Sequence, residues 1–343
     1  MTATPERPVA MGENPYMEAL AESVRNGDRR AMGRAITLIE SRRPDHQGQA
    51  LTLLDMLLPD TGNAVRVGIS GAPGVGKSTF IEAVGVELTG AGHRVAVLAV
   101  DPSSSRSGGS ILGDKTRMDS LSRDPAAFIR PSPSGGNLGG VARRTREAML
   151  VCEAAGFDVV IVETVGVGQS ETAVADMVDT FLLLIAPGGG DELQGIKRGI
   201  VEIADLVVVN KADGELAGQA KIITAEYSGA LHLLRPATSS WTPEVHMCSA
   251  LEKTGIGDVW RAVESHQRAL RAGGGLDRHR QAQARHWMWN EVGENLIAAL
   301  RDEPAAAELI PQLEQDVGAG HTTPGAAAQR LLGAFRSGGD GSR

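Results

Sequence analysis

The chain has 343 residues, of which 42% are hydrophobic and 3% aromatic, and its formal net charge is -8. This length suits one large α/β domain with smaller additions, and the low aromatic content predicts an aliphatic core. The acidic balance and the lack of a long basic run argue against nucleic acid or a membrane as the main partner, and no apolar run reaches transmembrane length.

Two features predict a cytoplasmic location. Residues 1–14 carry acids and prolines but no apolar segment of the kind found in secretory signals, and we expect them to be disordered. Cys152 and Cys248 lie in apolar segments and are predicted to be small buried hydrophobes, which suits a reducing compartment.

Residues 15–62 are predicted to form an N-terminal helical cap of three short helices. Gly27 and Arg43-Pro44 separate the three segments, because glycine and proline interrupt helices. The helices are marked by three apolar stripes: Met17, Leu20 and Val24; Met32, Ala35, Ile36 and Ile39; and Leu51, Leu54, Leu57 and Leu58.

Strands alternate with helices over residues 63–272, which predicts a mostly parallel, doubly wound sheet; with the phosphate-binding loop at residues 71–79 described below, it predicts a P-loop NTPase domain. In such sheets ligands bind beyond the carboxyl ends of the strands, where this chain carries polar residues. Strands are predicted at 65–70, 95–100, 127–129, 158–162, 181–186, 206–209 and 245–248, and helices at 77–89 and 141–155.

Residues 273–343 are predicted to form a C-terminal helical arm and tail. Three glycines at 273–275 make a break, a helix follows over 276–301, and Pro304 precedes a further helix and a Ser/Gly-rich end. Trp287 and Trp289 lie in the first of these helices, and aromatic residues are enriched at interfaces. We therefore expect the arm to make a homodimer, with packing onto its own domain as the alternative.

The strongest motif is a glycine-rich loop that matches G-x-x-x-x-G-K-[ST]. Glycines let successive backbone N–H groups point at phosphate oxygens, and the helix that follows adds its partial positive charge. Lys77 would supply a charge for the β- and γ-phosphates, and the Ser78 hydroxyl can bind Mg²⁺. A chance glycine-rich turn is the alternative, against which the flanking strand and helix argue. The predicted phosphate-binding residues are Gly71, Ala72, Pro73, Gly74, Val75, Gly76, Lys77, Ser78 and Thr79.

A second motif predicts guanine recognition. Asn210-Lys211-Ala212-Asp213 is an N-K-x-D sequence after an apolar strand, and the Asp213 carboxylate can accept from both N1–H and the 2-amino group of guanine. Adenine lacks these donors, so it would leave the carboxylate unpaired. Asn210 can hold the loops together or meet the N7 edge, and the Lys211 stem can cover the base. A backbone N–H of the later loop Ser249, Ala250 and Leu251 is expected at guanine O6.

Three carboxylates are candidates for Mg²⁺ and hydrolysis. Asp101 ends a predicted strand and opens a polar loop, with a helix or turn cap as the alternative role. Asp114 is a second candidate, with a helix N-cap as its alternative. Glu163 begins Glu163-Thr164-Val165-Gly166, where many small GTPases have D-x-x-G, so it would face the metal and the Gly166 N–H would meet the γ-phosphate.

The residues that follow this segment predict slow intrinsic hydrolysis. Gln169 lies three residues after Gly166 rather than next to it, so no glutamine in the usual place positions water, and a partner is expected to complete the site. Residues 188–197 form another glycine-rich stretch. It is either a flexible surface loop or a mobile segment near the nucleotide, with Gln194 or Lys197 responding to the nucleotide state.

Taken together, these motifs resemble the MeaB/MMAA family of GTPases, which chaperone methylmalonyl-CoA mutase and related adenosylcobalamin-dependent mutases. The resemblance extends over most of the chain, and its most specific parts are ETVGVGQSE from Glu163 and GGGDELQGIKRG from Gly188. It implies that Asp101, Asp114 and Glu163 serve Mg²⁺ and hydrolysis, and that residues 188–197 are a switch that couples GTP or GDP to the mutase. It also implies dimerisation through the C-terminal extension. Adenosylcobalamin would belong to the partner.

Two alternatives compete with the GTPase chaperone. A metal-insertion GTPase for a nickel enzyme would need a Cys/His cluster, whereas the eight histidines are scattered and the two cysteines lie far apart. A kinase linked to amino-acid transport would need a kinase catalytic-loop signature, which the chain lacks, and the guanine motif argues against ATP.

Overall fold

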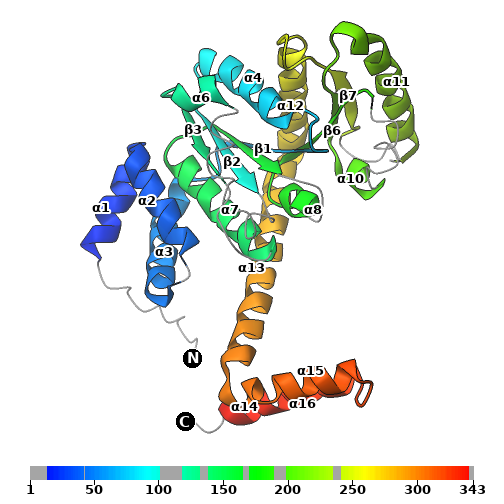
Figure 1. Cartoon of the computed structure of the whole chain (residues 1–343). Coiled ribbons are helices and arrows are strands. Elements are labelled where there is room, and N and C mark those ends of the chain that lie inside the picture. Colours follow the sequence, from blue (N-terminus) through cyan, green and yellow to red (C-terminus); the bar gives the residue numbers. More distant parts are fainter. Residues whose placement is uncertain are drawn as a thin grey trace. The chain divides into compact units, whose positions relative to one another are not determined.

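The computed structural model describes residues 14–41, 43–100, 118–131, 138–164, 170–188, 198–234 and 241–339. The chain divides into two compact units, Met1–Leu276 and Asp277–Arg343. The first unit holds a β-sheet with helices around it, and the second is helical (Figure 1). The predicted boundary at residue 62 stays a prediction.

The first unit is built on a seven-stranded sheet with the order β3-β2-β4-β1-β5-β6-β7, in which every pair is parallel. Most strands are buried along their length because helices cover both faces, which explains their continuous Val, Leu and Ile content. The strands are β1 (Val65–Gly71), β2 (Val95–Val100), β3 (Ala127–Arg130), β4 (Val159–Thr164), β5 (Thr180–Ile185), β6 (Leu206–Val209) and β7 (Glu244–Met247).

Two apolar cores lie on opposite faces of this sheet. Side chains alternate along a strand, so Val95 and Val97 of β2 join one core while Ala96 and Leu98 join the other. The first core packs against α4 (Lys77–Gly90), α6 (Asp119–Arg123) and α12 (Ile256–Arg271). The second packs against α7 (Leu138–Ala154) and the N-terminal helices. Further α-helices in the described part of this unit are α8 (Ser170–Ala175), α10 (Arg198–Ile203) and α11 (Ala217–Leu234).

The N-terminal helices are α1 (Pro15–Arg25), α2 (Arg29–Glu40) and α3 (Pro44–Leu57). Local chemistry sets where the first two begin. The Asn14 side chain accepts from the amides of Tyr16 and Met17, and the Asp28 side chain accepts from the Ala31 amide at 2.7 Å. The apolar stripes predicted for these two helices are buried, as expected.

The stripe predicted for the third helix was right only in part: Leu57 is buried and Leu54 is partly buried against the core, but its other two members are exposed. Its buried face is Ala50, Leu53 and Leu57, whereas Leu51 is 51% exposed and Leu58 is 56% exposed. The two candidate stripes differ by one residue, so both have helical spacing. The packing of α3 against α1, α2 and α7 decides which one is covered.

Strand positions agree with the sequence predictions to within a residue or two. The bounds of β2 and β6 match, and β4 runs two residues further than the predicted strand, so that Glu163 lies inside it. Cys152 and Cys248 are both buried free thiols, as predicted. Among the described residues, no helix is long and apolar enough to cross a membrane.

The second unit is reached through a break at Gly273, whose φ of +71° is left-handed. We predicted one helix after Pro304, whereas the structure has three. The helices are α13 (Gly275–Asp302), α14 (Pro304–Ala307), α15 (Ile310–Gly318) and α16 (Pro324–Gly339). The last of them packs against α14 and α15 and covers Ala306 and Leu313.

Candidate nucleotide-binding site

The glycine-rich loop lies where its sequence predicts, between the end of β1 and the start of α4. Gly74 and Gly76 have φ values of +81° and +94°, a region that residues with a Cβ rarely adopt. Gly76 is also the N-cap of α4, so the loop leads directly into a helix N-terminus. Val75 is buried and fixes the loop to the core.

Lys77 is 9% exposed, and its ammonium group is turned toward the loop's own backbone. Its Nζ donates to the Gly71 carbonyl at 2.8 Å and to the Ala72 carbonyl at 3.3 Å. These carbonyls hold a cation at the loop in which phosphates would lie. The charge of Lys77 is therefore at the loop, where it binds two backbone carbonyls.

Glu163 is brought to the same loop by the sheet. Parallel pairing aligns Glu163 of β4 with Ile69 of β1, and the Ser78 hydroxyl donates to Glu163 Oε1 at 3.2 Å. The carboxyl group is buried, and one residue further on the Thr164 hydroxyl donates to Ser70 Oγ at 2.9 Å. Ser78 and Glu163, two of the predicted Mg²⁺ ligands, therefore lie next to each other, and each has an oxygen atom that can bind a metal ion.

Asn210 joins three loops that are distant in sequence. Its Nδ2 donates to the Val75 carbonyl of the glycine-rich loop at 2.9 Å. Its Oδ1 accepts from the Ala250 amide at 3.0 Å and from the Cys248 thiol at 3.6 Å. Because Asn210 is buried and its donor and acceptor are both used, the predicted role of holding the loops together has a structural basis.

The next residue, Lys211, also contacts the glycine-rich loop. Its Nζ donates to the Gly74 carbonyl at 2.7 Å, and its φ of +59° places a non-glycine residue in the left-handed region. Such strain persists where the surroundings fix it, and it is common at binding sites. A Cβ on Gly76 would lie 2.7 Å from Asn210 Nδ2, so the two motifs are in close contact.

Asp213 is held by the last of the predicted loops. The Ser249 hydroxyl donates to Asp213 Oδ2 and accepts from the Glu252 amide at 3.0 Å. The Ser249 and Ala250 amides donate to Thr254 and Asn210 within the protein. The loop at 249–251 was predicted to offer one of its three backbone amides to guanine O6. Among the described residues, the Leu251 amide is the one that has no hydrogen bond.

Burial keeps the Cys248 side chain a hydrogen-bond donor. Desolvation raises the pKa of the Cys248 thiol to about 12, so the group stays neutral near pH 7. Its contact with Asn210, like the pair formed by Thr164 and Ser70, was missed from the sequence. The one feature of the sequence that could have indicated the Cys248 contact is its position directly before the loop at 249–251.

Other predicted site residues cannot be placed in this geometry. Asp101, Asp114, Gly166, Gln194 and Lys197 lie outside the described residues. The described part brings together the glycine-rich loop, Glu163, the N-K-x-D segment and the loop at 249–251. Their roles in binding a nucleotide remain predictions.

The parallel sheet, with this loop between its central strand and a helix, defines the P-loop NTPase class. The particular family follows from a comparison with known proteins. The family model described as methylmalonyl Co-A mutase-associated GTPase MeaB matches residues 32–305. The chain belongs to this family and is a GTPase of it.

Individual relatives align with nearly the whole length of this chain. A putative GTPase of Caulobacter vibrioides is 58% identical over 319 residues, which cover 93% of this chain and 98% of the relative. The methylmalonic aciduria type A homolog of Mus musculus, a mitochondrial protein, is 50% identical and covers 95% of this chain and 81% of its own length. A solved structure described as an LAO/AO transport system kinase is 41% identical, has a TM-score of 0.76 and covers 95% of this chain and 100% of its own.

Proposed function

We propose that this GTPase is a chaperone of an adenosylcobalamin-dependent acyl-CoA mutase, namely methylmalonyl-CoA mutase or a related enzyme. It would gate the loading of adenosylcobalamin and protect the mutase from inactivation. The observation that carries the proposal is the match to the MeaB family model over residues 32–305, whose description names this mutase. Adenosylcobalamin would be bound by the mutase.

Asp213 is proposed to select guanine. Its carboxylate accepts from Ser249, and an acceptor held in place loses little entropy when it pairs with the two donors of guanine. Asn210 and Lys211 would support the base from their positions beside Val75 and Gly74. The glycine-rich loop and Lys77 would bind the phosphates of GTP or GDP through amides and charge.

The residues present fit a magnesium ion. Mg²⁺ prefers oxygen ligands, and the Ser78 hydroxyl and Glu163 carboxylate are adjacent at the loop. The sequence offers Asp101 and Asp114 as further carboxylates. When bound, Mg²⁺ supplies positive charge against the phosphates. The protein's part is to hold these oxygens in place and to keep Lys77 at the loop.

The mutase is proposed to respond to the nucleotide through residues 188–197. These begin three residues after the end of β5, which pairs with β1 and so lies beside the glycine-rich loop. Gln194 and Lys197 have long polar side chains that could reach a phosphate or a partner. Differential contacts in two nucleotide states are what a switch requires.

The second unit is proposed to form a homodimer. Five large apolar side chains on α13 are exposed, and they recur at short intervals along its second half: Met288, Trp289, Val292, Leu296 and Ile297. Burying such a face on a second copy would remove it from water. Light scattering on Trp289→Glu/Leu296→Glu should show half the wild-type mass, and an unchanged mass would contradict the dimer.

The test of the main proposal is co-purification of the tagged protein with methylmalonyl-CoA mutase, with the cobalamin content of the captured mutase measured. Added mutase should stimulate GTP hydrolysis by the wild type. Lys197→Ala should keep nucleotide affinity and lose most of the stimulation. If the mutase neither binds nor changes the rate, the chaperone function is wrong, and equal stimulation of both proteins would place the coupling elsewhere.

The two alternatives have less support. The described residues contain no group of three His, Cys, Asp or Glu side chains that could hold a metal ion, so nothing there favours nickel insertion. The solved structure that is 41% identical is described as a kinase. The Asp213 carboxylate, which accepts a hydrogen bond from Ser249, favours guanine over adenine. A cytoplasmic location remains part of this proposal.

A further inference from the structure

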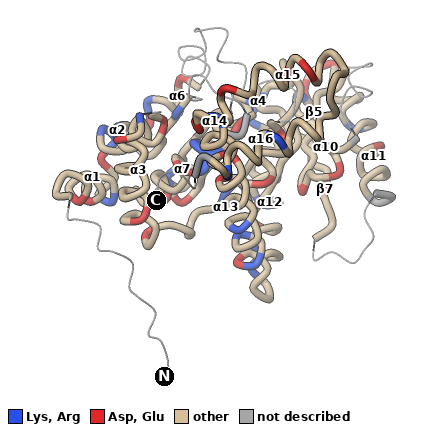
Figure 2. Tube along the Cα trace, turned by 90° about the horizontal axis from the view of Figure 1, so that it is seen from below, with Lys and Arg blue, Asp and Glu red and all other residues tan. Residues whose placement is uncertain are grey.

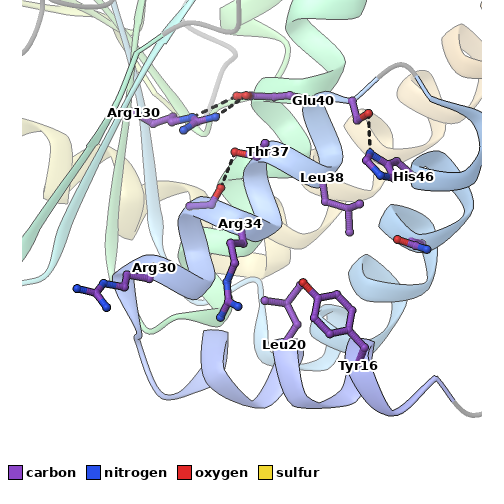
Figure 3. Close-up of a pocket in the computed structure, with 12 residues that line it drawn as sticks. Tyr16, Leu20, Arg30, Arg34, Thr37, Leu38, Glu40, His46 and Arg130 are labelled. Carbon is purple, nitrogen blue, oxygen red and sulfur yellow. Dashed lines mark hydrogen bonds and ion pairs between the residues drawn. The ribbon is translucent and has the colours of Figure 1, made fainter.

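A pocket of about 960 Å³ opens among the three N-terminal helices. Residues of α1, α2 and α3 and the last residue of β3, Arg130, line it, and none of them belongs to the nucleotide-binding loops (Figure 3). Nothing in the proposed GTPase function uses this pocket. Its lining therefore needs its own explanation.

The lining carries an excess of positive charge. Its only acid, Glu40, is neutralised by Arg130, whose Nε donates at 3.2 Å and whose Nη2 donates to the other carboxylate oxygen. Arg30 and Arg34 are also in the lining and are exposed, and neither guanidinium group forms an ion pair or a hydrogen bond among the described residues. In a chain of net charge -8, these two arginines give the pocket lining a local excess of positive charge. Figure 2 shows the positions of basic and acidic residues along the chain, with basic ones on α2.

The helix dipole does not account for Arg30. The first turn of α2 contains no acid, although the positive end of a helix favours acids and disfavours cations. The cap is already formed by Asp28. The pKa of this carboxyl group lies below its usual value, first because the Ala31 amide donates to it and then through smaller effects that include the charges of Arg34 and Arg30. A basic first turn is therefore better explained by what Arg30 binds.

The rest of the lining provides an apolar surface beside the charges. Tyr16 is 58% exposed, and in Figure 3 it lies next to Leu20 and close to Arg34, with Leu38 further along α2. Exposed tyrosine and arginine together are typical of the centres of protein interfaces. A guanidinium group can bind a carboxylate through two parallel hydrogen bonds.

We propose that this pocket docks a partner protein through a segment that carries carboxylates beside apolar side chains. The carboxylates pair with Arg30 and Arg34, and the apolar side chains cover Tyr16, Leu20 and Leu38. Charge complementarity selects the partner, since Glu40 is already bound and the unpaired groups are both cations. This surface is separate from the GTP site and does not depend on the identity of the GTPase's main partner.

The probe is a fluorescein-labelled amphipathic peptide of leucine and glutamate, titrated with the full-length protein and followed by anisotropy. Arg30→Glu/Arg34→Glu should raise its dissociation constant at least about tenfold. A charge-matched control, Lys221→Glu/Arg271→Glu, alters exposed cations elsewhere and should bind as the wild type does. The pocket variant should keep its basal GTPase rate and should not melt at a lower temperature, because an acidic side chain at position 30 would suit the first turn of a helix.

Several outcomes would overturn the proposal. One is equal affinity of wild type and pocket variant for the acidic peptide, and another is no binding by the wild type. Equal binding of a leucine–lysine peptide would show that charge does not select the partner. Binding to phosphatidylglycerol vesicles in preference to the peptide would assign the site to a membrane surface instead. A fall in melting temperature with peptide affinity unchanged would make the two arginines structural.

Discussion

The two sides of the candidate nucleotide site differ in how far they are already arranged. On the base side, Asn210 and Asp213 are both hydrogen-bonded to the loop at 249–251. On the phosphate side, Lys77 is bound to the carbonyls of its own loop, at Gly71 and Ala72. The proposed base side is therefore pre-organised by hydrogen bonds, whereas Lys77 would exchange these carbonyls for phosphate oxygens if the loop binds a nucleotide as proposed.

This difference has a physical consequence for specificity and turnover. Groups fixed in advance lose little entropy on binding, so the base side should contribute selectivity in every nucleotide state. If Lys77 moves from the loop carbonyls to phosphate oxygens, the strength of its interaction depends on the negative charge of the nucleotide's phosphates. We expect changes on the phosphate side to alter turnover most, and changes on the base side to alter which nucleotide binds.

The largest effect is expected for Lys77→Ala. It removes a charge-assisted contact of about 1.5–3 kcal/mol, which corresponds to roughly a ten- to 150-fold loss of GTP affinity, and it should abolish hydrolysis. Calorimetric titration and a phosphate-release assay measure the two effects. Lys221→Ala, which alters an exposed lysine of α11, serves as the control. Normal turnover by Lys77→Ala would rule out this loop as the phosphate site.

The next largest effect is expected for Asp213→Asn. It converts one acceptor into a donor, so preference should move from guanosine to xanthosine nucleotides, by about 10²-fold or more in the ratio of affinities. Competition between GTP and XTP measures that ratio directly. A wild type that binds ATP and GTP equally would contradict the assignment of this segment.

A smaller effect is expected for Ser249→Ala. The Asp213 carboxylate keeps its charge but loses the hydroxyl that positions it, and the Glu252 amide loses its acceptor. We expect a roughly threefold to tenfold loss of GTP affinity, because a typical hydrogen bond contributes about 1 kcal/mol. Ser249→Thr, which keeps the hydroxyl, should recover most of it. If both variants bind like the wild type, the base side is not organised by this bond.

The prediction with the smallest expected effect on nucleotide binding concerns the thiols. Burial raises the pKa of Cys248 from an ordinary value of 9.0 to about 12 and raises that of Cys152 as well. The thiolate is the reactive form, so at pH 8 the Cys248 thiolate should be about a thousandfold rarer than in the unfolded chain. Alkylation of the native protein at pH 8 should be negligible and should become rapid in denaturant. Rapid alkylation of Cys248 in the native protein would show that the loop at 249–251 opens.

Much of the fold was determined by local sequence. Continuous apolar runs predicted β2 and β6, because strands buried on both faces must be apolar throughout. The glycines at 74 and 76 fixed the loop before α4, since only glycine adopts its backbone angles readily. The two motifs also predicted Ser78 and Glu163 as ligands of one Mg²⁺, and the structure places their side chains within hydrogen-bond distance of each other at one edge of the sheet.

Tertiary structure decided what local pattern left open. Either apolar stripe of α3 has helical spacing, and only its packing against α1, α2 and α7 shows that Leu53 is buried and Leu51 is not. The bond from Asn210 to Val75 joins residues 135 positions apart, and the pocket beside Arg34 needs three helices and the end of a strand. Such contacts depend on how whole elements pack, which the spacing of residues within one element does not encode.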